Sequence, residues 1–336
     1  MDKILHIEEL GFPWKTRDPF IFCAYHYDDF PEGDGKMQIK EEYKKGRQIG
    51  NDFRILNGWR MYHGQSAPGF PYHPHRGFET VTINKKGVVD HSDSLGAAGR
   101  FMSGDVQWMT AGKGVLHSEM FPLVNADKRN PLEIFQIWLN LPSYNKMVDP
   151  HFKMLWAEDI PEIVLGSDDK LTKIQIITGS LLGKEGISPT PHSWAADPEN
   201  RVGIYTVEMS PGATWTLPPT DPEAVRDLYF YSGDKVEIDG VNIEKYAVIS
   251  VHSEAELDII NGEKNGKMLV LEGKPIAEPV AQHGPFVMNT RAEIMQAFEE
   301  YQRTQFGGWP WNVQEKMHDP SKGRFALYAD GTEETP

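Results

Sequence analysis

Two short motifs in this chain carry the residues best suited to bind a metal ion. His73 and His75 are two residues apart, and His117 and Glu119 have the same spacing. On an extended strand, residues i and i+2 point to the same face, so each motif presents its two side chains together. Two such strands facing each other inside a barrel would bring three imidazoles and one carboxylate to a single ion.

The mixture of nitrogen and oxygen ligands indicates which metals would fit. Imidazoles with one carboxylate suit Fe(II), Mn, Co, Ni, Cu or Zn better than Mg or Ca, which prefer oxygen ligands. Four protein ligands would leave two positions of an octahedral ion for water, O2 or a chelating substrate. Either motif alone is more often a pair of ordinary structural side chains, but the two motifs together favour a shared metal site.

Other ionisable residues near the motifs offer alternatives. Glu79 would share the face of His73 and His75 if no bulge intervenes, and so competes to be the carboxylate ligand. His91 and Asp93 also have the i, i+2 spacing. We interpret His91 as forming a hydrogen bond within a loop. The alternative is that His91 forms a hydrogen bond to one of the metal ligands and orients it.

The rest of the chain offers little further chemistry. Cys23 lies in an apolar run, which would raise the pKa of its thiol rather than activate it. Gly112 and Gly114 lack the context of a nucleotide-binding loop, and there is no Gly-x-Ser-x-Gly motif. Three histidines of the second half have no convincing second ligand beside them and are interpreted as structural: His192, His252 and His283.

Composition excludes several functional classes. The chain of 336 residues has 34 Lys and Arg against 49 Asp and Glu, which gives a net charge of −15. Such a surface suits neither nucleic acid nor an anionic membrane. One cysteine is typical of a reducing compartment, and no apolar run approaches the ~18 residues of a membrane span. With no signal-like N-terminus either, we expect a cytoplasmic protein.

The positioning elements are predicted to be β-strands. Short runs rich in Val, Ile, Thr and aromatic residues recur between turn-forming residues. Asp239-Gly240 predicts a two-residue hairpin turn. Thr290 and Glu293 predict a capping box at the start of one C-terminal helix. The pattern therefore favours an all-β sandwich or barrel rather than alternating strands and helices.

A change of composition between Leu141 and Pro150 predicts a domain boundary. We expect an N-terminal metal-binding domain over residues 1–145. A C-terminal domain without a metal site would follow over residues 146–336, ending in the helix and a tail.

Six segments resemble the pirin family of the cupin superfamily, and they occur in the family's order. They are Asp18–Phe20, His73–Val81, Gly104–Met120, Gln136–Pro142, Lys146-Met147 and Gln282–Thr290. The resemblance implies a bicupin, which is two tandem cupin barrels of the double-stranded β-helix (jelly-roll) type, with iron, as Fe(II), in the first. It also implies that the metal ligands are His73, His75, His117 and Glu119, with Glu79 outside the ligand set.

The function that this resemblance implies is a metal-dependent dioxygenase of the quercetinase type. A flavonol or similar enol would chelate the ion through a hydroxyl and a neighbouring carbonyl, and O2 would be the second substrate. Glu119 would be catalytic, accepting the hydroxyl proton if it loosens from the metal. The scheme ends in ring cleavage with release of carbon monoxide. The alternative implied by the family is a non-enzymatic, iron-binding regulatory protein with a protein partner.

Two parts of the chain carry no family motif that we can assign. Residues 37–65 include the charged run Lys40–Arg47, which predicts a solvated loop or a short surface helix. This segment precedes His73 and is a candidate to line or cap the pocket. The tail, residues 309–336, has no assigned role.

Overall fold

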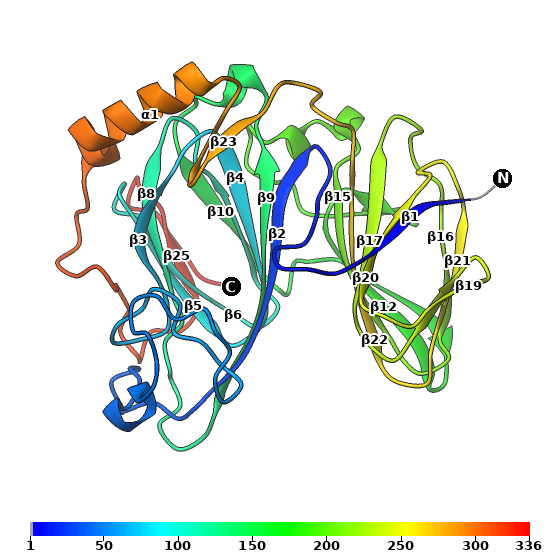
Figure 1. The fold of residues 1–336 in the computed structure, drawn as a ribbon, viewed down its shortest axis with the longest axis horizontal. Coiled ribbons are helices and arrows are strands. Elements are labelled where there is room, and N and C mark those ends of the chain that lie inside the picture. The colour runs from blue at the N-terminus through cyan, green and yellow to red at the C-terminus, as the bar shows by residue number, and fades with distance from the viewer. Residues whose placement is uncertain (1–2) are drawn as a thin grey trace. The chain divides into compact units, whose positions relative to one another are not determined.

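The computed structural model describes residues 3–336, which form two compact units. One unit, here called the histidine unit, comprises residues 25–137, 141–157 and 278–336. The other, called the second unit, comprises residues 3–24, 138–140 and 158–277. Strands dominate both, and one α-helix, α1 (Arg291–Thr304), is present among the described residues. The predicted all-β architecture with a C-terminal helix is therefore confirmed (Figure 1).

The histidine unit is built on two sheets with strand orders β10-β7-β4-β9-β2 and β26-β25-β6-β5-β8-β3. The first five residues of β2 and the last three of β9 are counted with the second unit. The strands of these sheets are β2 (Phe20–Phe30), β3 (Gly69–His75), β4 (Phe78–Lys86), β5 (Val88–Asp93), β6 (Ala98–Met102), β7 (Val106–Thr110), β8 (Val115–Met120), β9 (Asn130–Asn140), β10 (His151–Leu155), β25 (Phe325–Leu327) and β26 (Glu333–Glu334). A small hairpin adds β23 (Ala281–His283) and β24 (Phe286–Met288).

The second unit also contains two larger sheets, with orders β1-β20-β17-β22-β15-β12-β11 and β16-β21-β18-β19. Their strands, with the short pair β13 and β14, are β1 (Ile4–Glu9), β11 (Glu162–Ser167), β12 (Lys170–Thr178), β13 (Ser180–Leu181), β14 (Lys184–Glu185), β15 (Gly203–Met209), β16 (Thr214–Leu217), β17 (Val225–Ser232), β18 (Val236–Ile238), β19 (Val241–Ile243), β20 (Ala247–Val251), β21 (Leu257–Asn261) and β22 (Gly266–Gly273). Short 3-10 turns complete the chain: η1 (Glu41–Lys44), η2 (Ser143–Asn145), η3 (Trp194–Ala196), η4 (Pro198–Asn200) and η5 (Gln305–Gly307).

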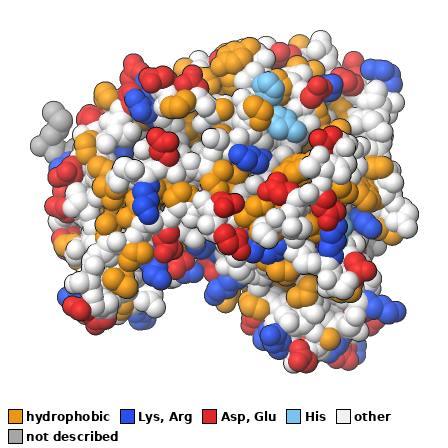
Figure 2. Space-filling view, turned by 180° about the vertical axis from the view of Figure 1, so that it is seen from behind, with side chains coloured by type: hydrophobic (Ala, Val, Ile, Leu, Met, Phe, Trp, Pro, Cys, Tyr) orange, Lys and Arg blue, Asp and Glu red, His pale blue; other side chains and the backbone are white. Residues whose placement is uncertain are grey.

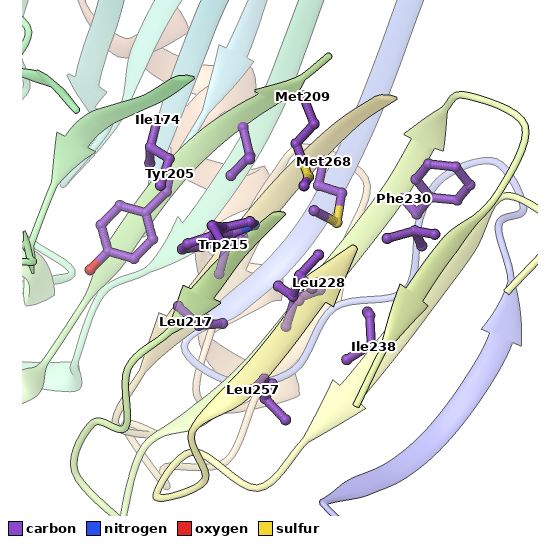
Figure 3. Packing of buried hydrophobic residues seen from close by; sticks show 14 of the residues in the cluster. Ile174, Tyr205, Met209, Trp215, Leu217, Leu228, Phe230, Ile238, Leu257 and Met268 are labelled. Carbon is purple, nitrogen blue, oxygen red and sulfur yellow. The ribbon is translucent and has the colours of Figure 1, made fainter. Parts of the chain in front are cut away.

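The core of the second unit follows from alternation along its strands. In β16, Trp215 and Leu217 are buried while the alternating residues Thr214 and Thr216 are exposed. Figure 3 shows Trp215, Leu217 and Leu228 among the side chains of one apolar cluster. The predicted hairpin is confirmed, because Asp239 (φ 52°) and Gly240 (φ 81°) join β18 to β19. Both residues take the positive φ that a type I′ turn requires.

The C-terminal helix begins as the sequence predicts. The Thr290 side chain accepts a hydrogen bond from the Glu293 backbone N–H, and the Glu293 carboxylate accepts one from the Thr290 N–H at 2.7 Å. Ile294 and Ala297 are buried against Phe286. Helix α1 and the tail lie in the histidine unit, whereas the predicted division assigns them to the domain over residues 146–336.

The tail joins this unit by pairing with a strand more than 200 residues earlier. β25 forms an antiparallel ladder with β6. Upstream of β25, the Trp311 indole N–H donates to the Asp93 carbonyl at 2.8 Å, and the His318 backbone N–H donates to Asp90 at 2.8 Å. Arg100 donates to the His318 carbonyl at 3.1 Å. Pairing over such a distance leaves no local trace in the sequence.

Asp90 and Arg100 form a buried ion pair, and its loss should destabilise this unit. Arg100 donates to both Asp90 oxygens at 2.7 and 2.8 Å, and both side chains are essentially inaccessible to solvent. We expect Asp90→Ala to cost about 3–5 kcal/mol, because it leaves a buried guanidinium without its counter-charge. Denaturant unfolding of the variant would measure this. Glu9→Ala, which breaks the exposed Glu9–Lys245 pair, should change stability by less than about 1 kcal/mol.

The surface carries mixed charge. Figure 2 shows Lys and Arg interspersed with Asp and Glu over the visible face, without a continuous basic patch. That nucleic acid is not a ligand stays a prediction. Among the described residues, no helix has both the length and the apolar character needed to cross a membrane.

Candidate metal site

The two metal-binding motifs lie on neighbouring strands. His73 and His75 are on β3, His117 is on β8, and the antiparallel register places His73 directly opposite His117. The sequence predicts two strands facing each other inside a barrel. The structure instead places them side by side in one sheet, where cross-strand pairs have close Cβ atoms.

The three imidazoles converge on one point. Their ligand nitrogens all lie within 4.8 Å of one another. The Nε2 atoms of His73 and His75 are 3.1 Å apart, and the ring of His117 lies 4.5 and 4.8 Å from those two rings. Two imidazoles bound at right angles to one ion, with bonds of about 2.1 Å, would have nitrogens about 3 Å apart. The spacing of His73 and His75 fits that requirement.

Hydrogen bonds around the rings leave nitrogen lone pairs for a metal. His73 Nδ1 lies 2.9 Å from the Pro71 carbonyl, which can only accept, so Nδ1 carries the proton and Nε2 is left as a lone pair. His117 is fully buried, and neither of its ring nitrogens has a hydrogen-bond partner. A buried nitrogen without a partner is costly unless a ligand satisfies it, and a metal ion would do so.

Burial keeps the three imidazoles neutral. Burial lowers the pKa of His73 to about 4. It holds the pKa values of His75 and His117 well below the ordinary value, with a further contribution from the neighbouring histidines. Only the neutral imidazole binds a metal, so the rings are in the right form at neutral pH.

Glu119, also on β8, lies next to the triad but outside the group of ligand atoms that are all within 4.8 Å of one another. One carboxylate oxygen, Oε2, lies 3.9 Å from His117 Nε2. Burial raises the pKa of Glu119, and the hydrogen bond from Thr82 opposes that rise. The carboxyl therefore lies beside the triad, in surroundings that favour its neutral form more than water does.

Thr82 and Gln136, from the other sheet, clamp this carboxyl. Thr82 Oγ1 lies 2.9 Å from Glu119 Oε1 and 2.7 Å from Gln136 Oε1, and Gln136 Nε2 donates to Glu119 Oε2 at 3.3 Å. Thr82 has one proton and donates to one oxygen at a time. When it donates to Gln136, a proton on Glu119 Oε1 completes the ring of hydrogen bonds. Neither residue carries a sequence signal, because β4 and β9 meet β8 only in the folded barrel.

Glu79 does not continue the face of His73 and His75. The chain turns at Gly77 (φ 83°), and β4 then enters the other sheet. Only glycine fits at this turn, because an added Cβ would lie 1.9 Å from the Val287 carbonyl oxygen. Glu79 is buried there and accepts a hydrogen bond from Thr110 at 2.7 Å. The condition for a shared face is therefore not met, because a turn separates the two strands.

His91 belongs to the wall of the site, which the loop interpretation missed. It lies on β5 opposite Glu119, fully buried, with its ring 5.6 Å from that of His117. Its Nε2 is 3.3 Å from Asp93 Oδ2. The same i, i+2 spacing that identifies the metal motifs was the available signal. The loop assignment is wrong because β5 pairs with β8 along this stretch.

Within residues 3–336, no group of three or more His, Cys, Asp or Glu side chains other than the triad is close enough to share an ion. His252 in the second unit lies 3.6 Å from Glu254, and both are substantially exposed. The absence of a metal from the second unit stays a prediction.

Comparisons with known proteins bear on both units. The pirin family model matches residues 36–139, and the model of the pirin C-terminal cupin domain matches residues 204–307. A pirin-like protein of Solanum lycopersicum is 33% identical over 288 residues, covering 81% of this chain and 87% of the relative. Pirin of Homo sapiens is 34% identical over 253 residues, covering 73% and 80%. A crystal structure of quercetin 2,3-dioxygenase from Acinetobacter baumannii shares 29% identity with a TM-score of 0.70, covering 92% of this chain and 99% of that one.

Proposed function

The chain belongs to the pirin family of bicupins, and from that premise we propose that it is a metal-dependent dioxygenase of the quercetinase type. The observation that carries the proposal is the convergence of three neutral imidazoles, two of them buried and one partly buried, beside one carboxyl. The likeness to a quercetin 2,3-dioxygenase over nearly the whole of both chains supports the same reaction class.

The residues that would hold the ion are His73, His75, His117 and Glu119. We propose Fe(II), with Mn, Co, Ni, Cu and Zn as the other ions that this donor set accepts. Such an ion would supply Lewis acidity and a common binding point for an enol substrate and O2. His117 is fully buried, whereas His73 is partly exposed, so the His73 side is where a substrate would enter.

Glu119 is proposed as the general base. It would take the hydroxyl proton of a flavonol-like substrate, and its neutral form is then hydrogen-bonded on both oxygens by Thr82 and Gln136. Burial raises the pKa of Glu119 toward neutrality, which improves its match to a base that works near pH 7. Thr82 and Gln136 position the carboxyl and do not touch the substrate.

We also propose a cytoplasmic location. The single cysteine, Cys23, is a buried free thiol whose pKa is raised by burial, so the fold depends on no disulfide. A reducing compartment would leave such a protein unchanged.

Removal of the metal tests the proposal directly. Purified protein should contain a transition metal by elemental analysis and should consume O2 when a flavonol is added. Dialysis against a chelator should abolish oxygen uptake, and addition of the original metal should restore it. Full turnover by metal-free protein would refute the proposal. Metal-loaded protein that consumes no O2 with any flavonol would favour the regulatory alternative.

A further inference from the structure

Residues 47–63 carry aromatic side chains that pack against Phe70 on β3, and Phe70 in turn packs against His73. We propose that this segment, together with Phe70, selects the substrate. In this arrangement, Phe53 and Phe70 hold the flat face of an aryl ring, and His63 accepts a hydrogen bond from a phenolic hydroxyl. The inference rests on the proposed function. The inference narrows the class of substrate to planar phenols that carry an aryl ring in addition to the hydroxyl and carbonyl that chelate the ion.

Buried charges hold the segment in one conformation. Arg47 donates to Asp52 at 2.8 Å and stacks on Trp59, with its guanidinium carbon 3.1 Å from the ring centre. Arg60 donates to both oxygens of Asp28 on β2, at 3.0 and 2.9 Å. All four charged side chains are less than 10% exposed. Ion pairs buried in this way are expensive to form and fix geometry more than they add stability.

From this anchored segment, aromatic rings lead inward to the metal site. Phe53 is 44% exposed, and its ring centre lies 4.9 Å from that of His63 and 6.4 Å from that of Phe70. The ring of Phe70 lies 6.2 Å from that of His73. These separations are typical of aromatic contacts. An exposed phenylalanine at the outer end of such a series offers an open face to a flat ligand.

His63 adds a directional polar group. Its Nδ1 lies 3.0 Å from the Gly50 carbonyl, so Nδ1 donates its proton there and Nε2 is left as an acceptor. The side chain is exposed, and its ring lies 5.9 Å from that of Phe70. A phenolic hydroxyl on a ring resting against Phe53 and Phe70 would donate to this nitrogen. An aliphatic chelator would use neither contact.

The test compares two ligands that share one chelating group. Quercetin and 3-hydroxy-4-pyranone both offer a hydroxyl next to a carbonyl, but only quercetin carries the additional aryl rings. Each would be titrated anaerobically into Co(II)-loaded protein, with binding followed by absorbance. Phe53→Ala should weaken quercetin roughly 3- to 10-fold and leave the pyranone unchanged, since one aromatic contact is lost. His63→Leu should likewise affect quercetin alone.

Two further variants complete the design. Phe53→Tyr retains the ring and should restore quercetin binding. Ile55→Ala removes another exposed apolar side chain of the same segment, 59% exposed, and should affect neither ligand. Equal effects of Phe53→Ala on both ligands, or none on either, would overturn the inference. If wild type binds both ligands with the expected selectivity but consumes no O2, the segment's role stands and the dioxygenase assignment falls. If wild type binds neither ligand, both proposals fall.

Discussion

Replacement of His117 by Leu is expected to abolish metal binding while leaving the metal-free protein at least as stable as wild type. The ring is fully buried and neither nitrogen has a partner, so in metal-free protein each is a desolvated polar atom that costs about 1–3 kcal/mol. Leu fills a similar volume without that cost. Loss of one direct ligand should weaken binding by at least about 100-fold, since even supporting residues contribute 10- to 100-fold.

Elemental analysis and thermal unfolding with and without added metal would measure both effects. Wild type should gain stability when metal is added, because the ion binds the folded state, whereas the variant should not. His252→Leu is the matched control, since His252 and Glu254 have the same spacing as His117 and Glu119 but are exposed. A His117→Leu protein with wild-type metal content would show that the triad is not the site.

The triad could be predicted because its geometry is local. A spacing of two residues on a strand is enough to place His73 beside His75. Only the pairing of β3 with β8, which brings His117 to them, could not be read from the sequence. The capping box of α1 and the Asp239-Gly240 turn were predictable for the same reason. Each depends on the φ and ψ preferences and side chains of a few consecutive residues.

The rest of the site depends on contacts between distant strands. Thr82 and Gln136 are 37 and 17 residues from Glu119 and reach it from another sheet. His91 faces the site only because β5 pairs with β8 on the side opposite β3. The tail belongs to the histidine unit only because β25 pairs with β6. Polar residues in such positions look like ordinary strand residues in the sequence. Their roles appear only once sheet order and register are known.

Which carboxyl takes part in the reaction is decided by comparing Glu119→Gln with Glu79→Gln. An amide at position 119 can still accept from Thr82 through its oxygen. Its NH2 group can donate to Gln136 once the Gln136 amide turns over and presents its oxygen, so packing should be retained. It cannot take a proton from the substrate. We expect Glu119→Gln to retain metal, at reduced affinity, and to lose oxygen uptake by about 100-fold or more, the usual contribution of a positioned base.

Glu79→Gln is the appropriate control because it makes the same chemical change at a buried carboxylate that also accepts from a threonine, Thr110 at 2.7 Å. It should keep both metal content and oxygen uptake. Metal content by elemental analysis and oxygen consumption with a flavonol would be measured for each. An active Glu119→Gln with an inactive Glu79→Gln would transfer the role to Glu79. Loss of metal from Glu119→Gln would show that its role as a ligand is indispensable, and the proposed role as a general base would then be left without support.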